Sequence, residues 1–264
     1  MRRMNRRTRM AVRIISFCLC ALSVTARADE EPNAAEELGM TQNVFTLGNL
    51  SIDYCERVFR FGSSPMSIVL LWHGGSGRGD DNLAQLTTPS LRPLLSYLAI
   101  NRINSVVLVP QCPSSAKSWI SGGERSPMMA TRALVRNKAQ SYRVASTNVF
   151  FAGISMGGTA AYSLLAADTP NLFHKAIVCS GAGDTSLAPA ITAIVRLFNG
   201  EKDSIVDPAG GQAMADAINA AGGKAFFNLL PDHDHVSAAD VAFSFLQWDW
   251  FFKPNANRLV VLVR

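Results

Sequence analysis

The sequence has few cysteines, few charged side chains and only short apolar runs. Five of its 264 residues are cysteines, and their spacing matches no zinc or dithiol redox pattern. Beyond the first 28 residues, no charge-free apolar run approaches the roughly 20 residues of a membrane-spanning helix, so we expect no stable membrane anchor. Charged residues make up 17% of the chain and apolar residues 48%, which excludes a disordered chain and is typical of one large globular domain.

Acidic residues are absent from residues 1–28, which carry seven arginines. Without this segment the chain has 18 basic and 20 acidic side chains, so its formal charge of +5 does not indicate a nucleic-acid partner. An apolar run of 11 residues, Ile14 to Val24, precedes the small residues Ala26 and Ala28. This pattern predicts a signal peptide cleaved after Ala28 and a secreted or periplasmic protein, with an uncleaved anchor as the alternative.

The remaining chain divides into three parts. Residues 29–42 are polar and acidic without a strand or long-helix period, and predict a flexible leader. Residues 43–254 show regular hydrophobic patterning, with no repeat or low-complexity linker, and predict a single folded domain. Residues 255–264 form a C-terminal tail containing Leu-Val-Val-Leu-Val, which is either an added strand or a frayed end.

Apolar, β-branched runs recur along the domain and predict strands buried on both faces. These runs are Arg57–Phe61, Ser67–Trp72, Ser105–Pro110, Asn148–Ala152, Lys175–Cys179, Ile194–Asn199 and Ala225–Leu230. Helical segments are expected at Met128–Gln140, Met156–Ala167, Gly211–Ala221 and Ala239–Phe251. The alternation predicts an α/β, doubly wound, mostly parallel sheet. Gly48 and Asn49 separate two extended stretches within Thr46–Phe61, which predicts an antiparallel hairpin at the sheet edge.

One serine has the setting of a nucleophile. Gly153-Ile154-Ser155-Met156-Gly157 follows a predicted strand and precedes a helix rich in small residues. A serine on such a sharp turn needs glycines two positions to either side, because a Cβ there would clash. The helix N-terminus also favours negative charge that develops beside the serine. The motif predicts Ser155 as the nucleophile of a serine hydrolase.

A serine hydroxyl also needs a base and a group that orients the base. Asp203 follows the strand Ile194–Asn199 and is the predicted acid, with Asp207 and Glu201 as rivals. His235 follows the last predicted strand and is the predicted base, with His233 as the alternative. The order nucleophile, acid, base is that of α/β-hydrolases. The alternation of histidine and aspartate at 232–235 could also indicate a metal site, but no third set of ligands accompanies it, so no metal is expected.

Acyl transfer further needs hydrogen-bond donors for the oxyanion. One predicted donor is the backbone N–H of Met156, directly after the nucleophile. The second is expected from the glycine-rich loop that begins at His73, with Gly75 or Ser76 as the donor. His73 itself is better explained as an orienting or packing residue of this loop than as a second base.

These motifs together resemble a bacterial family of secreted esterases. The residues that carry the resemblance are H-G-G-S-G-R-G-D-D-N from His73, P-Q-C-P followed by Trp119, and G-I-S-M-G-G around Ser155. The family is described as predicted peptidases or phospholipase/carboxylesterase-like proteins, and lies near feruloyl esterases and polyhydroxybutyrate depolymerases. Around the base, Asp234 stands where the family has glycine, and no tryptophan follows until Trp248.

The resemblance covers residues 55–252 and implies an α/β-hydrolase fold, cleavage of carboxylic esters and no cofactor. The segment between Cys179 and Ile194 leaves little room for a lid domain, so no sizeable lid is expected. It implies that Trp119 lines the acyl or alcohol pocket, with a packing tryptophan as the alternative. Gln111 lies on the same rim, so the candidate substrate-binding residues are Trp119, His73 and Gln111. An antiparallel strand at Asp53–Phe61 beside the strand ending at Pro110 would bring Cys55 close to Cys112, and a disulfide is expected there.

The sequence therefore predicts a secreted ester hydrolase that acts through an acyl-enzyme on a small or polymer-linked ester. A serine peptidase is the second hypothesis, because the same triad serves both reactions. A secreted binding protein that retains the fold is the third, and a broken triad would be its mark. The sequence does not indicate an oligomeric state.

Overall fold

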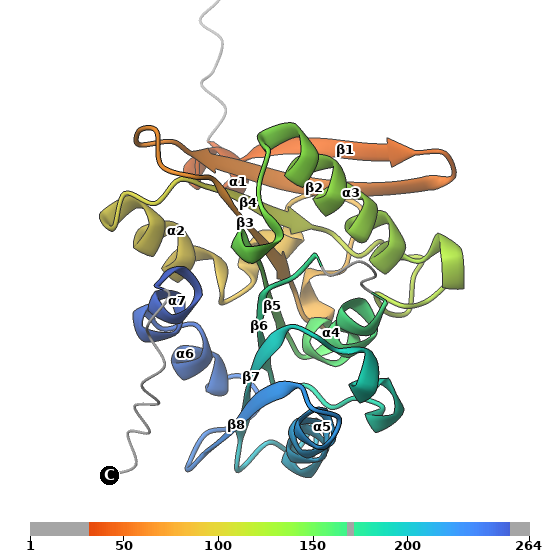
Figure 1. Cartoon of the computed structure of the whole chain (residues 1–264). Helices are drawn as coiled ribbons and strands as arrows, with labels where there is room; N and C mark the ends of the chain where they lie inside the picture. The colour runs from red at the N-terminus through yellow and green to blue at the C-terminus, as the bar shows by residue number, and fades with distance from the viewer. Residues whose placement is uncertain (1–31, 168–171, 254–264) are drawn as a thin grey trace, which may run out of the picture. The chain divides into compact units, whose positions relative to one another are not determined.

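The computed structural model describes residues 32–167 and 172–253. The predicted signal peptide 1–28 and tail 255–264 lie outside these residues. The described residues form an eight-stranded sheet in the order β1-β2-β4-β3-β5-β6-β7-β8 (Figure 1). The strands are β1 (Thr41–Leu47), β2 (Leu50–Phe59), β3 (Ser67–Trp72), β4 (Ser105–Pro110), β5 (Val149–Ile154), β6 (Lys175–Cys179), β7 (Ile194–Gly200) and β8 (Lys224–Leu230).

The sheet is mostly parallel with an antiparallel edge. β1 pairs antiparallel with β2, and β2 pairs antiparallel with β4, whereas all pairs from β4 to β8 are parallel. The β1–β2 hairpin turns at Gly48 and Asn49, where Gly48 has a φ of 57°, a conformation that costs glycine little. The predicted fold class and the predicted edge hairpin are confirmed.

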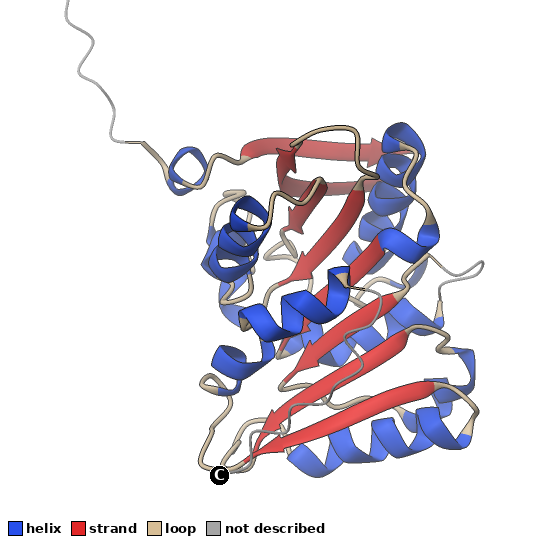
Figure 2. Cartoon of the chain, turned by 60° about the vertical axis from the view of Figure 1, so that its left-hand side comes forward, coloured by secondary structure: helices blue, strands red, loops and turns tan. Residues whose placement is uncertain are grey.

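Helices cover both faces of the sheet (Figure 2). On one face α3 (Pro127–Tyr142), α4 (Met156–Ala166) and α5 (Pro208–Ala220) pack on the sheet, and on the other lie α1 (Ala34–Glu37), α2 (Leu91–Ile100), α6 (Ala238–Ala242) and α7 (Phe245–Phe252). Short 3-10 helices in the connections are η1 (Gly75–Gly77), η2 (Ala84–Thr87), η3 (Gly123–Arg125), η4 (Ser146–Asn148) and η5 (Thr185–Ala190). None of the helices in the described residues is long and apolar enough to span a membrane.

The direction of each crossover decides which face its helix covers. The connection from β3 to β4 steps toward the antiparallel edge and places α2 on one face. The connections from β4 to β5, β5 to β6 and β7 to β8 step the other way and place their helices on the opposite face. Right-handed crossovers produce this pattern. As a result, β3 and β5 are neighbours whose connections leave toward opposite faces. In open α/β sheets, ligands bind beside the carboxyl ends of two such strands.

Two predicted segments differ from the structure. The described part of the predicted flexible leader packs on the domain, with Ala35, Leu38 and Met40 buried in the core, and Thr41 already begins β1. Asn33 starts α1 with a capping box, a signal too short to give a helical period. The predicted helix Ala239–Phe251 is two helices, α6 and α7, because the chain leaves helical geometry at Ser244.

The expected disulfide between Cys55 and Cys112 is absent, and both thiols are free and buried. The antiparallel pairing of β2 with β4 is as expected, and Cys55 lies opposite Val109. However, Cys55 belongs to the core cluster on the α2 side of the sheet, whereas Cys112 belongs to the cluster on the α4 side. Neighbouring backbones are therefore not enough, because the two side chains point to opposite faces.

Candidate active site

The loops that carry the predicted site residues lie at the carboxyl ends of the parallel strands. The loop after β3 begins at His73, and Ser155 follows β5 on the neighbouring strand. A Cβ placed on Gly74 would lie 3.2 Å from the Cβ of Ser155, so the two loops touch at the nucleophile. The candidate site thus lies beside the carboxyl ends of β3 and β5, where the direction of the crossover connections changes.

Ser155 has a strained backbone, with φ 54° and ψ −119°. A non-glycine residue in this region costs on the order of 1–3 kcal/mol, which the surrounding packing must offset. The flanking glycines allow the turn: a Cβ on Gly153 would lie 2.8 Å from the Gly157 oxygen, and one on Gly157 would lie 2.7 Å from the His73 oxygen. The backbone N–H of Ser155 donates to the Cys179 oxygen at 3.0 Å, which ties the turn to β6.

Ser155, His235 and Asp203 are brought together by hydrogen bonds. The Nε2 of His235 lies 2.8 Å from the Oγ of Ser155, and its Nδ1 lies 2.8 Å from the Oδ2 of Asp203. The Asp203 side chain is fully buried. A carboxylate only accepts, so the Nδ1 of His235 carries the proton and Nε2 is free to receive the serine proton. This is the geometry of a base held by an acid.

The loop after β7 presents Asp203 and not its rivals. The Oδ1 of Asp203 accepts the backbone N–H groups of Ile205 and Val206, both at 2.9 Å, which leaves Oδ2 for His235. Asp207 instead caps α5 by accepting the Ala209 N–H, and it is exposed. Glu201 is exposed and its backbone N–H bonds β8 at Leu230.

The loop after β8 holds His235 by a similar turn. The Oδ1 of Asp234 accepts the N–H groups of Val236 and Ser237 at 3.0 and 2.8 Å. The alternative base, His233, turns its Nδ1 to the Pro231 oxygen at 2.7 Å instead of to the serine. Sequence reasoning missed Ser180, a buried residue with a φ of 49° whose hydroxyl donates to the His235 oxygen at 2.8 Å. A serine after a predicted strand gave no signal of this role.

His73 is 1% exposed and holds its own loop. Its Nε2 accepts the Cys112 N–H at 3.0 Å, so its Nδ1 carries the proton and donates to the Gly74 oxygen at 2.6 Å. Burial lowers the pKa of His73 from 6.5 to about 4, which keeps the ring neutral near pH 7. The structure supports the orienting role and offers no exposed ring to a substrate.

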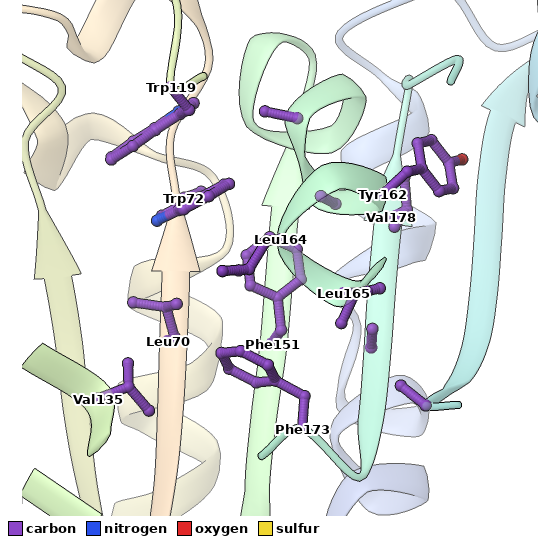
Figure 3. Close-up of a cluster of buried hydrophobic side chains, with 14 of the residues drawn as sticks. Leu70, Trp72, Trp119, Val135, Phe151, Tyr162, Leu164, Leu165, Phe173 and Val178 are labelled. Atoms are coloured by element: carbon purple, nitrogen blue, oxygen red, sulfur yellow. The ribbon is translucent and has the colours of Figure 1, made fainter. Parts of the chain in front are cut away.

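Trp119 and Gln111 are also buried, at 0% and 1% exposure. The ring of Trp119 stacks on that of Trp72, with 4.4 Å between the ring centroids (Figure 3). The Nε1 of Trp119 donates to the His73 oxygen at 3.3 Å. Gln111 bonds the loop after β3 through its amide. Both side chains are buried against other parts of the protein. For Trp119 this agrees with the alternative that it is a packing residue, and for Gln111 it corrects the expected contact with substrate.

The backbone N–H groups predicted to bind the oxyanion can be compared by their direction and their hydrogen bonds. The Gly74 carbonyl points to the His73 ring, and in a trans peptide the next N–H points the opposite way. Gly75 is exposed, and nothing lies within 4 Å of a Cβ placed on it. Within the described residues, the N–H groups of Gly75, Ser76 and Met156 donate no hydrogen bond. Met156 on one loop, and Gly75 and Ser76 on the other, therefore have N–H groups that are open to a ligand at Ser155.

The histidine, cysteine and carboxylate groups of the described residues form neither a metal site nor a second nucleophile. Residues 32–167 and 172–253 contain no group of three or more His, Cys, Asp or Glu side chains placed to hold a metal ion. Burial raises the pKa of the thiols of Cys55 and Cys179 to about 12, and that of Cys112 to about 11. The three thiols are therefore protonated near pH 7 and are poor nucleophiles.

A strained serine between β5 and α4, followed along the chain by an acid after β7 and a histidine after β8, is the arrangement of the α/β-hydrolase fold. The chain has this fold, as expected. The segment Ser180–Ala193 between β6 and β7 contains only the short helix η5, so no large lid is inserted there.

Solved structures show the same fold, although no family model and no curated protein matches the sequence. A thermostable esterase is similar with a TM-score of 0.69 and 22% identity over 81% of this chain and 62% of that esterase. An esterase of Pyrococcus furiosus is similar with a TM-score of 0.59 and 14% identity over 80% and 90% of the two chains. Puromycin hydrolase has a TM-score of 0.62 and 12% identity over 81% of this chain and 39% of its own.

Proposed function

We propose that this protein is a serine hydrolase that cleaves carboxylic esters through an acyl-enzyme. The observation that carries the proposal is the hydrogen-bonded line from Ser155 through His235 to Asp203, with 2.8 Å at each step. Two of the similar structures are named as esterases, which supports the same chemistry. Ser155 stands on a strained turn, and Asp203 and His235 complete the nucleophile, base and acid arrangement that such a reaction requires.

The reaction follows from the geometry. Ser155 Oγ attacks the ester carbonyl carbon while His235 Nε2 takes its proton, and buried Asp203 stabilises the resulting imidazolium. The N–H groups of Met156 and Gly75 donate to the oxyanion of the tetrahedral intermediate, which is worth about 10²- to 10³-fold in rate per donor. His235 then protonates the leaving alcohol. Water then attacks the acyl carbon while His235 Nε2 takes its proton, and the bond to Ser155 Oγ breaks as His235 returns the proton to Oγ and the acid leaves.

A serine peptidase remains the second candidate, and a similar structure named puromycin hydrolase favours keeping it. The ester reaction is preferred because an alkoxide is a much better leaving group than an amide ion, so that ester cleavage depends less on precise proton delivery from His235 than amide cleavage does. A non-catalytic binding protein has no need for the strained turn at Ser155 or for an aligned, buried Asp203.

The test is a substrate panel with the purified protein and its Ser155→Ala variant. p-Nitrophenyl acetate, butyrate and octanoate, methyl ferulate and a peptide p-nitroanilide are compared by kcat/KM. The proposal expects ester cleavage that depends on Ser155 and exceeds cleavage of the amide. A higher kcat/KM for the amide would establish the peptidase, and no Ser155-dependent turnover of any substrate would favour a binding protein.

We further propose that residues 1–28 export the protein and are removed after Ala28. The support is the segment's charge pattern and apolar run. The intact mass of protein recovered outside the cytoplasm tests this, and a mass that still includes residues 1–28 would contradict it.

A further inference from the structure

Gln111, in the loop after β4, links that loop to the loop after β3 and to strand β2, although it lies outside the triad. Its backbone N–H donates to the Asp53 oxygen of β2 at 2.8 Å, which fixes the residue to the sheet. Its amide bonds only the loop after β3: Oε1 accepts the Asn82 N–H at 2.7 Å, and Nε2 donates to Asp81 Oδ1 at 2.7 Å and to the Gly77 oxygen at 3.3 Å. All hydrogen-bonding positions of this buried amide, save one lone pair, are directed at that loop.

The strongest of these bonds goes to a carboxylate. Asp81 Oδ1 also accepts the N–H groups of Leu83 and Ala84 at 2.9 and 3.0 Å. These hydrogen bonds and the one from Gln111 lower the pKa of Asp81 to about 2, so the group is ionised near pH 7. A hydrogen bond to an ionised acceptor is roughly twice as strong as a neutral one, and the amide of Gln111 is therefore firmly held.

The loop after β3 packs tightly against the side-chain amide of Gln111. A Cβ on Gly79 would lie 2.9 Å from the Nε2 of Gln111, and the Gly79 N–H donates to the Cys112 oxygen at 3.1 Å. The Gly77 N–H in turn bonds the Gly74 oxygen at 3.3 Å. The Gln111 contacts thus continue, through Gly77, to the peptide that carries the Gly75 N–H.

We infer that Gln111 is a positioning residue that holds the loop after β3 so that the Gly75 N–H faces the oxyanion formed at Ser155. This rests on the proposed function. Gln111 does not touch substrate, because it is 1% exposed and its amide is used within the protein. Its removal acts on the transition state, where the oxyanion exists, and leaves substrate binding nearly unchanged.

The test variant is Gln111→Glu, which keeps the shape and replaces the donor by a group that is a donor only when protonated. When protonated, the introduced carboxyl group donates to Asp81 as the amide does, whereas the ionised carboxylate repels Asp81. The charged and titratable neighbours on the packed segments are Asp81, Asp53, Arg78, His73 and the thiols of Cys55 and Cys112. Of these, the pKa values of His73 and the two thiols lie at about 4 and at 11 or above, outside pH 5.5–8.

We expect the ratio of variant to wild-type kcat for p-nitrophenyl butyrate to fall by about 10- to 100-fold between pH 5.5 and 8, while KM changes less than about threefold. The affinity of a trifluoromethyl ketone, whose adduct with Ser155 carries an oxyanion, falls in parallel. The matched control is Gln212→Glu, because Gln212 also donates to a carboxylate, Asp216 Oδ1 at 2.8 Å, but on the exposed surface of α5. For Gln212→Glu, the ratio of variant to wild-type kcat should not change between pH 5.5 and 8.

A pH-independent ratio in folded Gln111→Glu, or a change confined to KM, would overturn the inference. If that variant does not fold, Asp81→Asn replaces it. The amide introduced at position 81 still accepts hydrogen bonds but carries no charge, so a uniform loss of kcat supports the inference and an unchanged kcat overturns it. If the wild type itself shows no Ser155-dependent turnover, the proposed function fails. That result is distinct from a failure of the inference about Gln111, which concerns only the variants of an active wild type.

Discussion

The two sides of Ser155 are built by different kinds of contact. On the acid and base side, Asp203 and Asp234 hold their loops through backbone N–H groups two and three residues ahead. On the oxyanion side, the loop after β3 is held by residues far along the chain: the Asn82–Gln111 bond spans 29 residues, the His73–Cys112 bond 39. Local turns thus contribute on the acid and base side, beside the Ser180–His235 bond, whereas contacts with a neighbouring loop hold the oxyanion side.

The difference implies that substitutions on the two sides act differently. Asp203 contacts His235, so under the proposed mechanism its loss impairs the proton transfer directly. His73 and Trp119 act through the loop that they hold, so their loss changes how well the oxyanion donors are placed. The predictions below separate these effects, and they run from the largest expected change in rate to the smallest.

Asp203→Asn is expected to lower kcat by about 10⁴-fold, because the amide no longer fixes the tautomer of His235 or stabilises its charged form. The measurement is kcat for p-nitrophenyl butyrate at pH 8. Asp207→Asn is the matched control, since Asp207 caps α5 and does not contact the base. An equal loss in the control would show that the acid has been assigned to the wrong residue.

His73→Gln is expected to lower kcat by about 10- to 100-fold at pH 8, because glutamine cannot bridge Cys112 and Gly74 in the same way. It also changes the pH dependence of stability. The pKa of His73 is lower in the folded protein, at about 4, than its ordinary value of 6.5. The unfolded chain therefore binds the proton more readily, and stability is present above pH 6.5 and is lost as the pH falls toward 4.

Urea unfolding of the wild type and of His73→Gln from pH 8 to 4 measures this effect. The wild type should lose up to about 3 kcal/mol of unfolding free energy from this one group. The variant lacks that contribution, so the difference between the two proteins narrows as the pH falls. Parallel curves over the whole range would mean that His73 is not held neutral by burial.

Trp119→Phe is expected to have the smallest effect, a loss of a few-fold in kcat that is equal for acetate, butyrate and octanoate esters. Phenylalanine retains the ring that stacks on Trp72 but loses the donor to the His73 oxygen, a bond worth about 1 kcal/mol. The three esters are compared by KM. A KM that changes with acyl length would instead place Trp119 in the substrate pocket.

Much of the fold could be predicted from the sequence because its strands are short, apolar and buried on both faces. The bounds of β3, β4 and β6 agree with the predicted runs. Helix α2 was not predicted and the helix near the C-terminus was predicted as one instead of two, since tertiary packing decides such bounds. The disulfide failed because the strand pairing does not by itself tell which face of the sheet a side chain after Pro110 occupies.

The site residues, too, could be predicted only in part from the sequence. Asp203 and His235 could be found because each follows a strand end and the chain order limits the choice. The burial of Gln111 and Trp119 could not be predicted, because their partners are 29 and 46 residues away and are brought close only by the folded sheet. A residue after a strand end can face the cleft or the neighbouring loop, and the sequence does not distinguish these directions.

The central claim is that Ser155 is a nucleophile activated by His235. The most direct measurement is covalent labelling of the wild type and of His235→Ala with a fluorophosphonate, followed by peptide mapping. The account predicts one phosphonyl group on Ser155 in the wild type and a labelling rate at least about 10³-fold slower in the variant. A label on another residue, or equal rates in the two proteins, would contradict it.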